Sequence, residues 1–228
     1  MPVDPTVDPV SLDPGFDHPI FSASIQLIRQ ALGPDDAFNA LPQIHQDLLL
    51  RLIHSSGDLS LLGDVRLSTG ACEAGAAALA AGAPLLTDTA MAAAAVAPMA
   101  LRTFGNSVCT VLDWAPPFAP AGSTRTAAGM ARALIDRPGA VVLIGSAPTA
   151  LDQMMQLVAK GDVAPPALVI GMPVGFVGVV ESKRRLAASA LPHILLEGSR
   201  GGAGLAGAAA NALLRHAWLQ RLGQHGEP

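Results

Sequence analysis

The sequence is poor in aromatic residues, in charges and in cysteine. Aromatic side chains make up 4% of the 228 residues and charged ones 14%, against about a quarter charged in an average soluble protein. Hydrophobic residues reach 50%, which excludes a mainly disordered chain because there is ample apolar surface to bury. Alanine supplies 42 residues, so we expect a core of small side chains whose backbones approach closely.

Other features that the sequence lacks bear on the cellular compartment of the protein and on the molecules that it binds. Cys72 and Cys109 form neither a CxxC pair nor a metal-ligand spacing, which indicates a reducing compartment and no metal site. Residues 1–17 are acidic and proline-rich, unlike a signal peptide. No nearly apolar run reaches the roughly 18 residues that cross a bilayer. Net charge is −4 and no long basic run occurs, which disfavours nucleic-acid binding. These features predict a cytoplasmic protein that binds neither membranes nor nucleic acid.

The hydrophobic pattern predicts an irregular lead-in over 1–18 and one α/β domain over 19–228. Two helices come first, over 19–32 and from Pro42 to a stop at Ser55-Ser56-Gly57. Five apolar runs then alternate with alanine-rich helical stretches, the pattern of a doubly wound three-layer sandwich with a five-stranded parallel sheet. The predicted strands are 84–88, 107–112, 140–145, 167–171 and 193–197, and the remaining helices are 72–81, 91–102, 126–136, 150–160, 182–190 and 204–222.

Polar clusters follow these strands at their carboxyl ends, where parallel sheets bind ligands. Asp88, Ser146 and the glycine-rich stretch 198–204 all lie at such ends. Four familiar signatures are missing: the P-loop, GxGxxG after a strand, the GxSxG elbow and the HExxH zinc motif. The glycines of 198–204 fit either a tight strand-to-helix turn or an anion cradle at a helix N-terminus.

Three ionisable residues stand out. His54 falls in the last turn of a predicted helix, where the helix dipole favours the imidazolium, so it is either a general acid or a C-capping residue. Arg125 precedes a predicted helix and fits either a carboxylate fork or a surface cation. Lys183, one of only two lysines, falls at a predicted helix start, where a cation is disfavoured, which is a weak sign of a ligand. These residues indicate an α/β protein that binds a small polyanion.

A series of motifs, in a fixed order, resembles the precorrin-8X methylmutase family. They are IHSSG at 53–57, TDTAM at 87–91, GSTR at 122–125, IGSAPTAL at 144–151, GMPVGFVG at 171–178 with ESK at 181–183, and RGG at 200–202. The resemblance runs from about Phe21 to Leu214. It implies a flavodoxin-like domain that works as a homodimer without a cofactor.

The resemblance also implies an isomerase of cobalamin biosynthesis. Its reaction moves a methyl group from C-11 to C-12 of precorrin-8X, giving hydrogenobyrinic acid. The family's proton donor falls on His54, and its substrate-binding positions fall on Ser24, Asp88, Thr124, Arg125, Ser146 and Lys183. The substrate is a flat tetrapyrrole ringed by carboxylates, which suits arginine, backbone amides and a protonated histidine.

Three features depart from the family pattern. Ser146 stands where asparagine is usual, Ala203 stands where serine is usual, and a run of alanines follows Met91. Each change removes or shrinks a polar contact. These changes leave open a paralogue that binds corrinoids without turnover. The cobalt-precorrin-8 methylmutase of the anaerobic route is a second alternative, because both versions of the pathway share these motifs. A nucleotide- or flavin-binding module is a third alternative, against which the missing phosphate loops and scarce aromatic residues argue.

Overall fold

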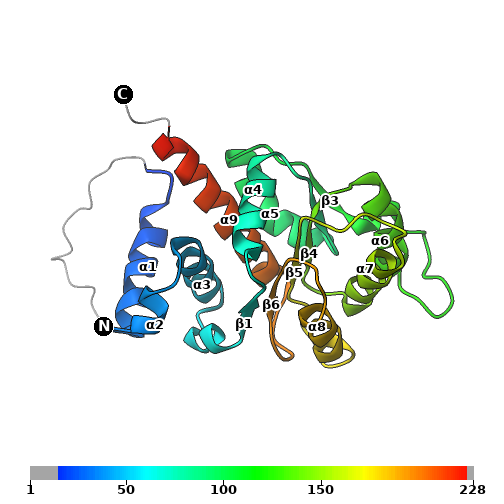
Figure 1. The fold of residues 1–228 in the computed structure, drawn as a ribbon, viewed down its shortest axis with the longest axis horizontal. Coiled ribbons are helices and arrows are strands. Elements are labelled where there is room, and N and C mark those ends of the chain that lie inside the picture. The colour runs from blue at the N-terminus through cyan, green and yellow to red at the C-terminus, as the bar shows by residue number, and fades with distance from the viewer. Residues whose placement is uncertain (1–14, 225–228) are drawn as a thin grey trace.

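The structure, a computed structural model, describes residues 15–224. Within this part of the chain, six strands form one mixed sheet in the order β1-β6-β5-β4-β2-β3, flanked by helices (Figure 1). The strands are β1 (Val65–Leu67), β2 (Leu85–Thr87), β3 (Val108–Thr110), β4 (Val141–Ile144), β5 (Leu168–Gly171) and β6 (His193–Leu196). All five predicted parallel strands are present.

The expectation of five strands in an all-parallel sheet was wrong, because β1 adds a sixth. It pairs antiparallel with β6, with Val65 opposite Leu196 and Leu67 opposite Ile194. Among the other five strands, numbered along the chain, the order is 2-1-3-4-5. In such an order the chain reverses its direction of progress between the first and third strands, here β2 and β4, which opens a crevice at their carboxyl ends.

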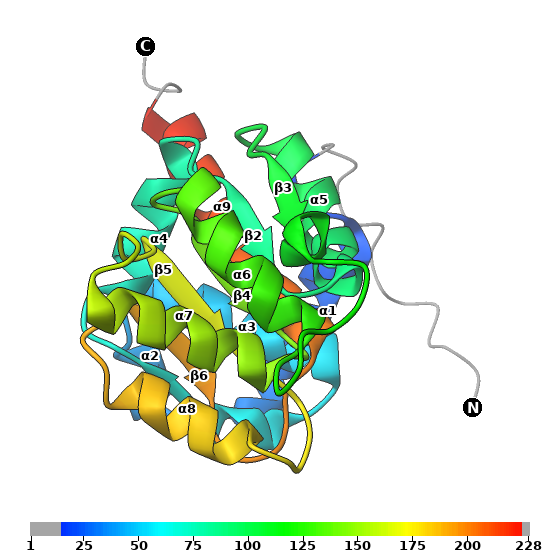
Figure 2. The same cartoon turned by 90° about the vertical axis from the view of Figure 1, so that its right-hand side faces the viewer.

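Alternate strand residues point to opposite faces of the sheet and build two cores. Val141 and Leu143 face one core, whereas Val142 and Ile144 face the other. The first face is covered by α3 (Gln43–Ser56), α4 (Ala71–Ala80), α5 (Ala90–Arg102) and α9 (Ala203–Gln224). The second is covered by α6 (Arg125–Asp136), α7 (Pro148–Lys160) and α8 (Val179–Ala187), which stand in front of the sheet in Figure 2.

Small residues allow close helix packing in the first core, as the composition predicts. At the crossing of α5 and α9, a Cβ added to Gly207 would lie 2.6 Å from Cβ of Ala95. A larger residue at Gly207 would therefore push the two helices apart. No helix in the described part of the chain is long and apolar enough to span a bilayer.

Helices α1 (Pro19–Leu32) and α2 (Asp36–Asn39) lie outside α3, at the left of Figure 1. They bury a small apolar cluster around Phe38, Leu49 and Leu50. Two 3-10 turns, η1 (Leu59–Gly63) and η2 (Val111–Trp114), complete the elements of the described region. Of the predicted lead-in, residues 15–18 precede α1 in irregular structure, and residues 1–14 lie outside the described residues.

Candidate active site

Loops at the carboxyl ends of the parallel strands are joined by backbone hydrogen bonds. The amide of Gly175, after β5, donates to the carbonyl of Ser199, after β6, at 3.0 Å, and the amide of Gly202 donates to the carbonyl of Met172 at 2.8 Å. A Cβ at Gly201 would lie 2.1 Å from the same Met172 oxygen, so glycine is required there by close approach. The glycines of 198–204 thus form a tight turn with fixed geometry.

Asp88, which follows β2, binds the loop after the neighbouring strand β4. Its Oδ2 accepts hydrogen bonds from the amides of Gly145, Ser146 and Ala147 at 3.1, 2.6 and 2.7 Å. The residue is fully buried, and its negative charge lies at the N-terminus of α7, where the helix dipole favours an anion. In the free chain the Asp88 carboxylate therefore shapes the loop, and the half-buried Ser146 is the more accessible of the two.

Thr124 and Arg125 begin α6 beside that loop. The Thr124 hydroxyl caps the helix by accepting from the Ala127 amide, and it lies 2.8 Å from Oγ1 of Thr149 near the start of α7. Arg125 is exposed, and its Nε donates to the carbonyl of Pro116 at 2.9 Å. The structure thus brings Thr124 close to the Ser146 loop and leaves part of the Arg125 guanidinium facing solvent.

His54 lies in the last turn of α3, as predicted, and Gly57 ends the helix in a left-handed conformation. Its imidazole is exposed, and Nδ1 lies 2.7 Å from Oγ of Ser24 on α1. The ring of Phe21 meets the imidazole edge to face, with the ring centroids 5.0 Å apart. Two neighbours on α1 therefore orient the histidine, and one of them, Ser24, is a predicted site residue.

The electrostatic surroundings of His54 differ from the expectation based on the helix dipole. Partial burial of the ring, followed by the positive charge of Arg51, lowers the pKa of His54 below its ordinary value of 6.5. Both effects disfavour the imidazolium. The imidazole is therefore mainly neutral near pH 7 in the free chain, and protonation needs a negative charge brought from elsewhere.

Arg51 is the functional candidate that the sequence analysis missed. It is half-buried one turn before His54, and its guanidinium lies over the Phe21 ring, 4.8 Å from the centroid. Burial and the neighbouring Arg215 lower the pKa of Arg51. Whereas Arg215 is paired with Asp17, no ion pair or hydrogen bond joins the Arg51 guanidinium to another residue of the described chain. The sequence feature that could have pointed to Arg51 is a cation one helical turn before the histidine, on a helix otherwise rich in leucine.

Lys183 has a different environment from the one expected. Helix α8 begins at Val179, three residues earlier than predicted, so Lys183 lies in its middle and is 2% exposed. Its ammonium donates to the carbonyls of Gly198 and Arg200 at 2.9 and 2.6 Å. Burial lowers its pKa to about 8. In the free chain the amine is thus hydrogen-bonded to the loop after β6.

An ion-pair network joins that loop to the end of the His54 helix. The Arg200 guanidinium pairs with Asp58 and Asp64, and it donates to Oγ of Ser60 at 2.9 Å. Asp58 follows α3 directly, and Asp64 precedes β1. The predicted residues thus form two groups at the same end of the sheet, one around His54 and one around the start of α7, while Lys183 lies apart on α8 and contacts the loop after β6.

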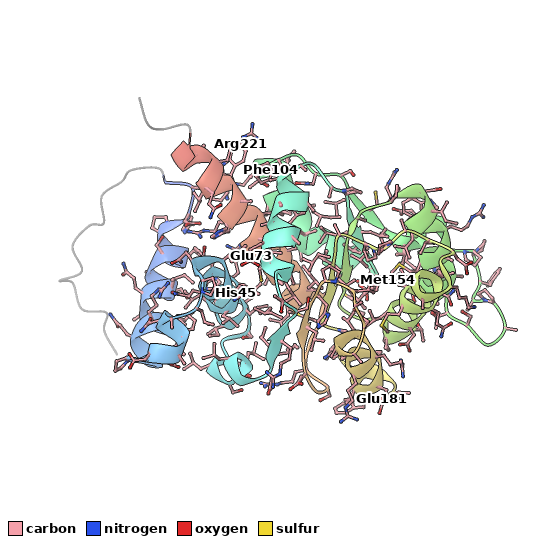
Figure 3. All side chains as sticks on the ribbon, in the orientation of Figure 1. His45, Glu73, Phe104, Met154, Glu181 and Arg221 are labelled. Carbon is pink, nitrogen blue, oxygen red and sulfur yellow. The ribbon has the colours of Figure 1, made fainter. Side chains whose placement is uncertain are left out.

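The cavities beside His54 are small. One of about 240 Å³ is lined by Ser24, His54 and other residues of α1 and α3, and one of about 230 Å³ lies between Phe21, Arg51 and α9. A larger cavity, about 720 Å³, lies between α3, α4 and α9 at the opposite end of the sheet, where Figure 3 labels Glu73, Phe104 and Arg221. It contains none of the predicted site residues, so we place the candidate site at the carboxyl ends of the strands. No group of three or more His, Cys, Asp or Glu within residues 15–224 is arranged to hold a metal ion.

Comparison with known proteins decides the family. A family model described as precorrin-8X methylmutase matches residues 19–216. The chain belongs to the precorrin-8X methylmutase family. It is therefore an isomerase of cobalamin biosynthesis, and the family implies a precorrin substrate.

Individual relatives support the same family assignment. The chain is 36% identical over 219 residues to a cobalt-precorrin-8 methylmutase from Synechocystis sp., covering 90% of this chain and 98% of the relative. It is 41% identical over 178 residues to a precorrin-8X methylmutase from Pseudomonas aeruginosa, covering 76% and 85%. The crystal structure of precorrin-8x methyl mutase from Thermus thermophilus matches with a TM-score of 0.78 and 37% identity, covering 88% of this chain and 96% of that one. Relatives thus carry both the cobalt-free and the cobalt names.

Proposed function

We propose that this chain moves the methyl group from C-11 to C-12 of precorrin-8X, giving hydrogenobyrinic acid, with His54 as the proton donor. The observation that carries the proposal is an exposed imidazole held in one orientation, with Ser24 at Nδ1 and the Phe21 ring packed edge to face against it. Protonating the macrocycle lowers the barrier to moving electrons around its conjugated system. A positioned acid of this kind is worth about 10²–10⁴ in rate.

The hydrogen bond between Ser24 and His54 is compatible with both protonation states of the imidazole. A serine hydroxyl can donate to a neutral Nδ1 or accept from a protonated one. The hydrogen bond to Nδ1 can therefore persist while the proton moves at the other ring nitrogen. We assign proton donation to Nε2 on this ground.

Arg51 supplies a way to couple substrate binding to protonation. Its positive charge lowers the pKa of His54 in the free chain. A substrate carboxylate paired with Arg51 would offset that charge and add its own, so the pKa of His54 would rise when the polycarboxylate binds. The proton donor would then be charged mainly in the complex.

The remaining predicted residues fit the binding of a carboxylate-ringed macrocycle. Arg125 offers an exposed guanidinium, and Thr124 and Ser146 offer polar groups beside the crevice between β2 and β4. The parallel-strand order 2-1-3-4-5 supports the flavodoxin-like assignment. We propose direct substrate contact for these three residues and Ser24, and no cofactor. Direct contact by Asp88 and Lys183 stays a prediction of the resemblance, as does the cytoplasmic location.

We further propose that the chain works as a homodimer. Apolar side chains are exposed in the loop after β5, where Val174, Phe176 and Val177 are 49%, 93% and 89% exposed. Phe118, after β3, is also exposed. Exposed apolar side chains in one region support a surface that another molecule covers. A second copy over these loops would enclose a substrate as broad as a tetrapyrrole.

The test is turnover by purified protein, followed as the absorbance change from precorrin-8X to the corrin product. His54→Ala should retain the fold and slow turnover by about 10²–10⁴, while His45→Ala, at the other end of α3, should leave turnover near the wild-type rate. Wild-type turnover should decline as pH rises through the pKa of His54 in the complex. Near-normal turnover by His54→Ala would refute the assignment.

The same assay separates the alternatives. Parallel reactions with precorrin-8X and its cobalt form show which substrate is preferred. Tight binding of hydrogenobyrinate by the wild type, with no conversion of either precursor, would instead identify a corrinoid-binding paralogue.

A further inference from the structure

Lys183 stands out because it is a buried lysine whose ammonium is hydrogen-bonded within the protein itself. Glu181 lies at the lower edge of the molecule in Figure 3, whereas Lys183, two residues later on α8, is 2% exposed. Both hydrogen bonds of its ammonium go to main-chain carbonyls, those of Gly198 and Arg200. A buried charge is costly unless it is hydrogen-bonded, so its partners define what the side chain does.

The second of those carbonyls belongs to Arg200, whose side chain in turn contacts the segment that follows α3. Its guanidinium pairs with Asp58 and donates to Ser60. The Asp58 amide in turn donates to the hydroxyl of Ser56 at 3.1 Å, and that hydroxyl donates to carbonyls in the last turn of α3 at 2.9 and 3.2 Å. That turn carries His54. Polar contacts made by Lys183, Arg200, Asp58 and Ser56 thus connect α8, through the loop after β6, to the last turn of α3.

We infer that Lys183 is a positioning residue: it fixes the main chain at Arg200, and Arg200 fixes the end of α3 that presents His54. The inference rests on the proposed role of His54. It differs from direct substrate contact by Lys183, because the side chain acts before any ligand is present. Both ends of the path are secured by secondary structure, α8 at one end and α3 at the other, so displacement of the loop is transmitted to the imidazole.

The first test uses the free protein and needs no turnover. The His54 ring resonances, followed by NMR at fixed pH, should shift in Lys183→Met and in Asp58→Asn. Asn still caps η1, so the second variant removes mainly the charge that binds Arg200. Lys160→Met, which changes the only other lysine at the exposed end of α7, should leave the resonances in place. Unchanged His54 resonances in folded Lys183→Met would overturn the inference, whatever the protein catalyses.

The second test is a double-mutant cycle on turnover. If Lys183 acts through Arg200 and Asp58, Lys183→Met and Asp58→Asn should each lower kcat about tenfold or more, and the double variant should be no worse than the more severe single one. Direct substrate contact predicts instead that the two effects multiply and that Lys183→Met acts mainly on KM. Multiplying effects would therefore overturn the inference.

Two further variants keep the test decisive. Lys183→Arg should restore most of the activity, because it keeps the charge and donors, and a cavity of about 230 Å³ beside Lys183 can take the larger head group. If Lys183→Met does not fold, Lys183→Gln, which retains N–H donors and removes the charge, takes its place in the cycle and in the NMR experiment. A Gln variant that lowers kcat but multiplies with Asp58→Asn would refute the positioning role.

Discussion

Replacing Asp88 by asparagine should destabilise the protein by disrupting the start of α7. The carboxylate is fully buried, and its Oδ2 alone accepts hydrogen bonds from three consecutive amides, those of Gly145, Ser146 and Ala147. These amides lie in the turn between β4 and α7, before the first helical residue. Asp88 thus satisfies three backbone donors at buried or half-buried positions, where an unpaired amide is costly.

The magnitude follows from the loss of charge. The asparagine carbonyl oxygen is neutral, so the hydrogen bonds from all three amides weaken, because charge-assisted hydrogen bonds are about twice as strong as neutral ones; the summed loss is comparable to one hydrogen bond to a charged group. A lost hydrogen bond to a charged group costs about 1.5–3 kcal/mol, and loss of the negative charge at the helix N-terminus adds about 0.3–2 kcal/mol. The free energy of unfolding should fall by about 2–5 kcal/mol, which for a chain of this size lowers Tm by about 4–20 °C.

Urea and thermal unfolding, followed by circular dichroism, measure this change. The matched control is Asp162→Asn, because Asp162 lies just beyond the other end of α7 and is exposed. It should change stability by less than about 0.5 kcal/mol. If Asp88→Asn loses less than about 1 kcal/mol, the three amides have other partners in solution and the structural role assigned to Asp88 is wrong.

Three further predictions concern charge and assembly. Because burial lowers the pKa of Lys183 from 10.5 to about 8, the unfolded chain holds this proton when the folded chain has lost it. The wild type should therefore gain up to about 3 kcal/mol of stability relative to Lys183→Met as pH rises from 8 to 10.5; a constant difference in urea unfolding would contradict this. Arg51→Met should raise the pKa of His54, measured by NMR titration, and an unchanged pKa would mean that burial alone sets it. Phe176→Asp should lower the fraction of dimer, measured by sedimentation, relative to the wild type. An equal fraction of dimer in the two proteins would place the interface elsewhere.

The parallel strands could be predicted because they are buried on both faces. Strands covered by helices on both sides read as continuous apolar runs, such as Val141–Ile144 in β4. β1 has no such signature. It is three residues long, with exposed Arg66 between two half-buried residues, and it is a strand only because β6 lies alongside it. Pairing that depends on a partner about 130 positions away along the chain has no local signal in the sequence.

Within the candidate site, the sequence predicted where a residue falls along a helix more reliably than which side chains it contacts. The place of His54 at a helix end follows from the Ser55-Ser56-Gly57 stop, which is a local signal. The contact with Ser24 depends on α1 packing across α3 and was not expected, because the family resemblance gave Ser24 only as a substrate-binding position. Arg51 was missed because helical periodicity assigns a face to a residue but cannot show that its guanidinium makes no ion pair or hydrogen bond within residues 15–224.

Lys183 shows most clearly where reasoning from the sequence stops. A cation near a helix start conflicts with the helix dipole, and that conflict was interpreted as a sign of a ligand. In the folded chain α8 begins earlier, and the ammonium is bound by the carbonyls of Gly198 and Arg200. The conflict with the helix dipole therefore disappears in the structure, and the partners of the ammonium are main-chain oxygens of the protein itself; substrate contact by Lys183 stays a prediction. A buried charge identifies a constrained position, and only its contacts distinguish a group that binds substrate from one that holds the binding loop in place.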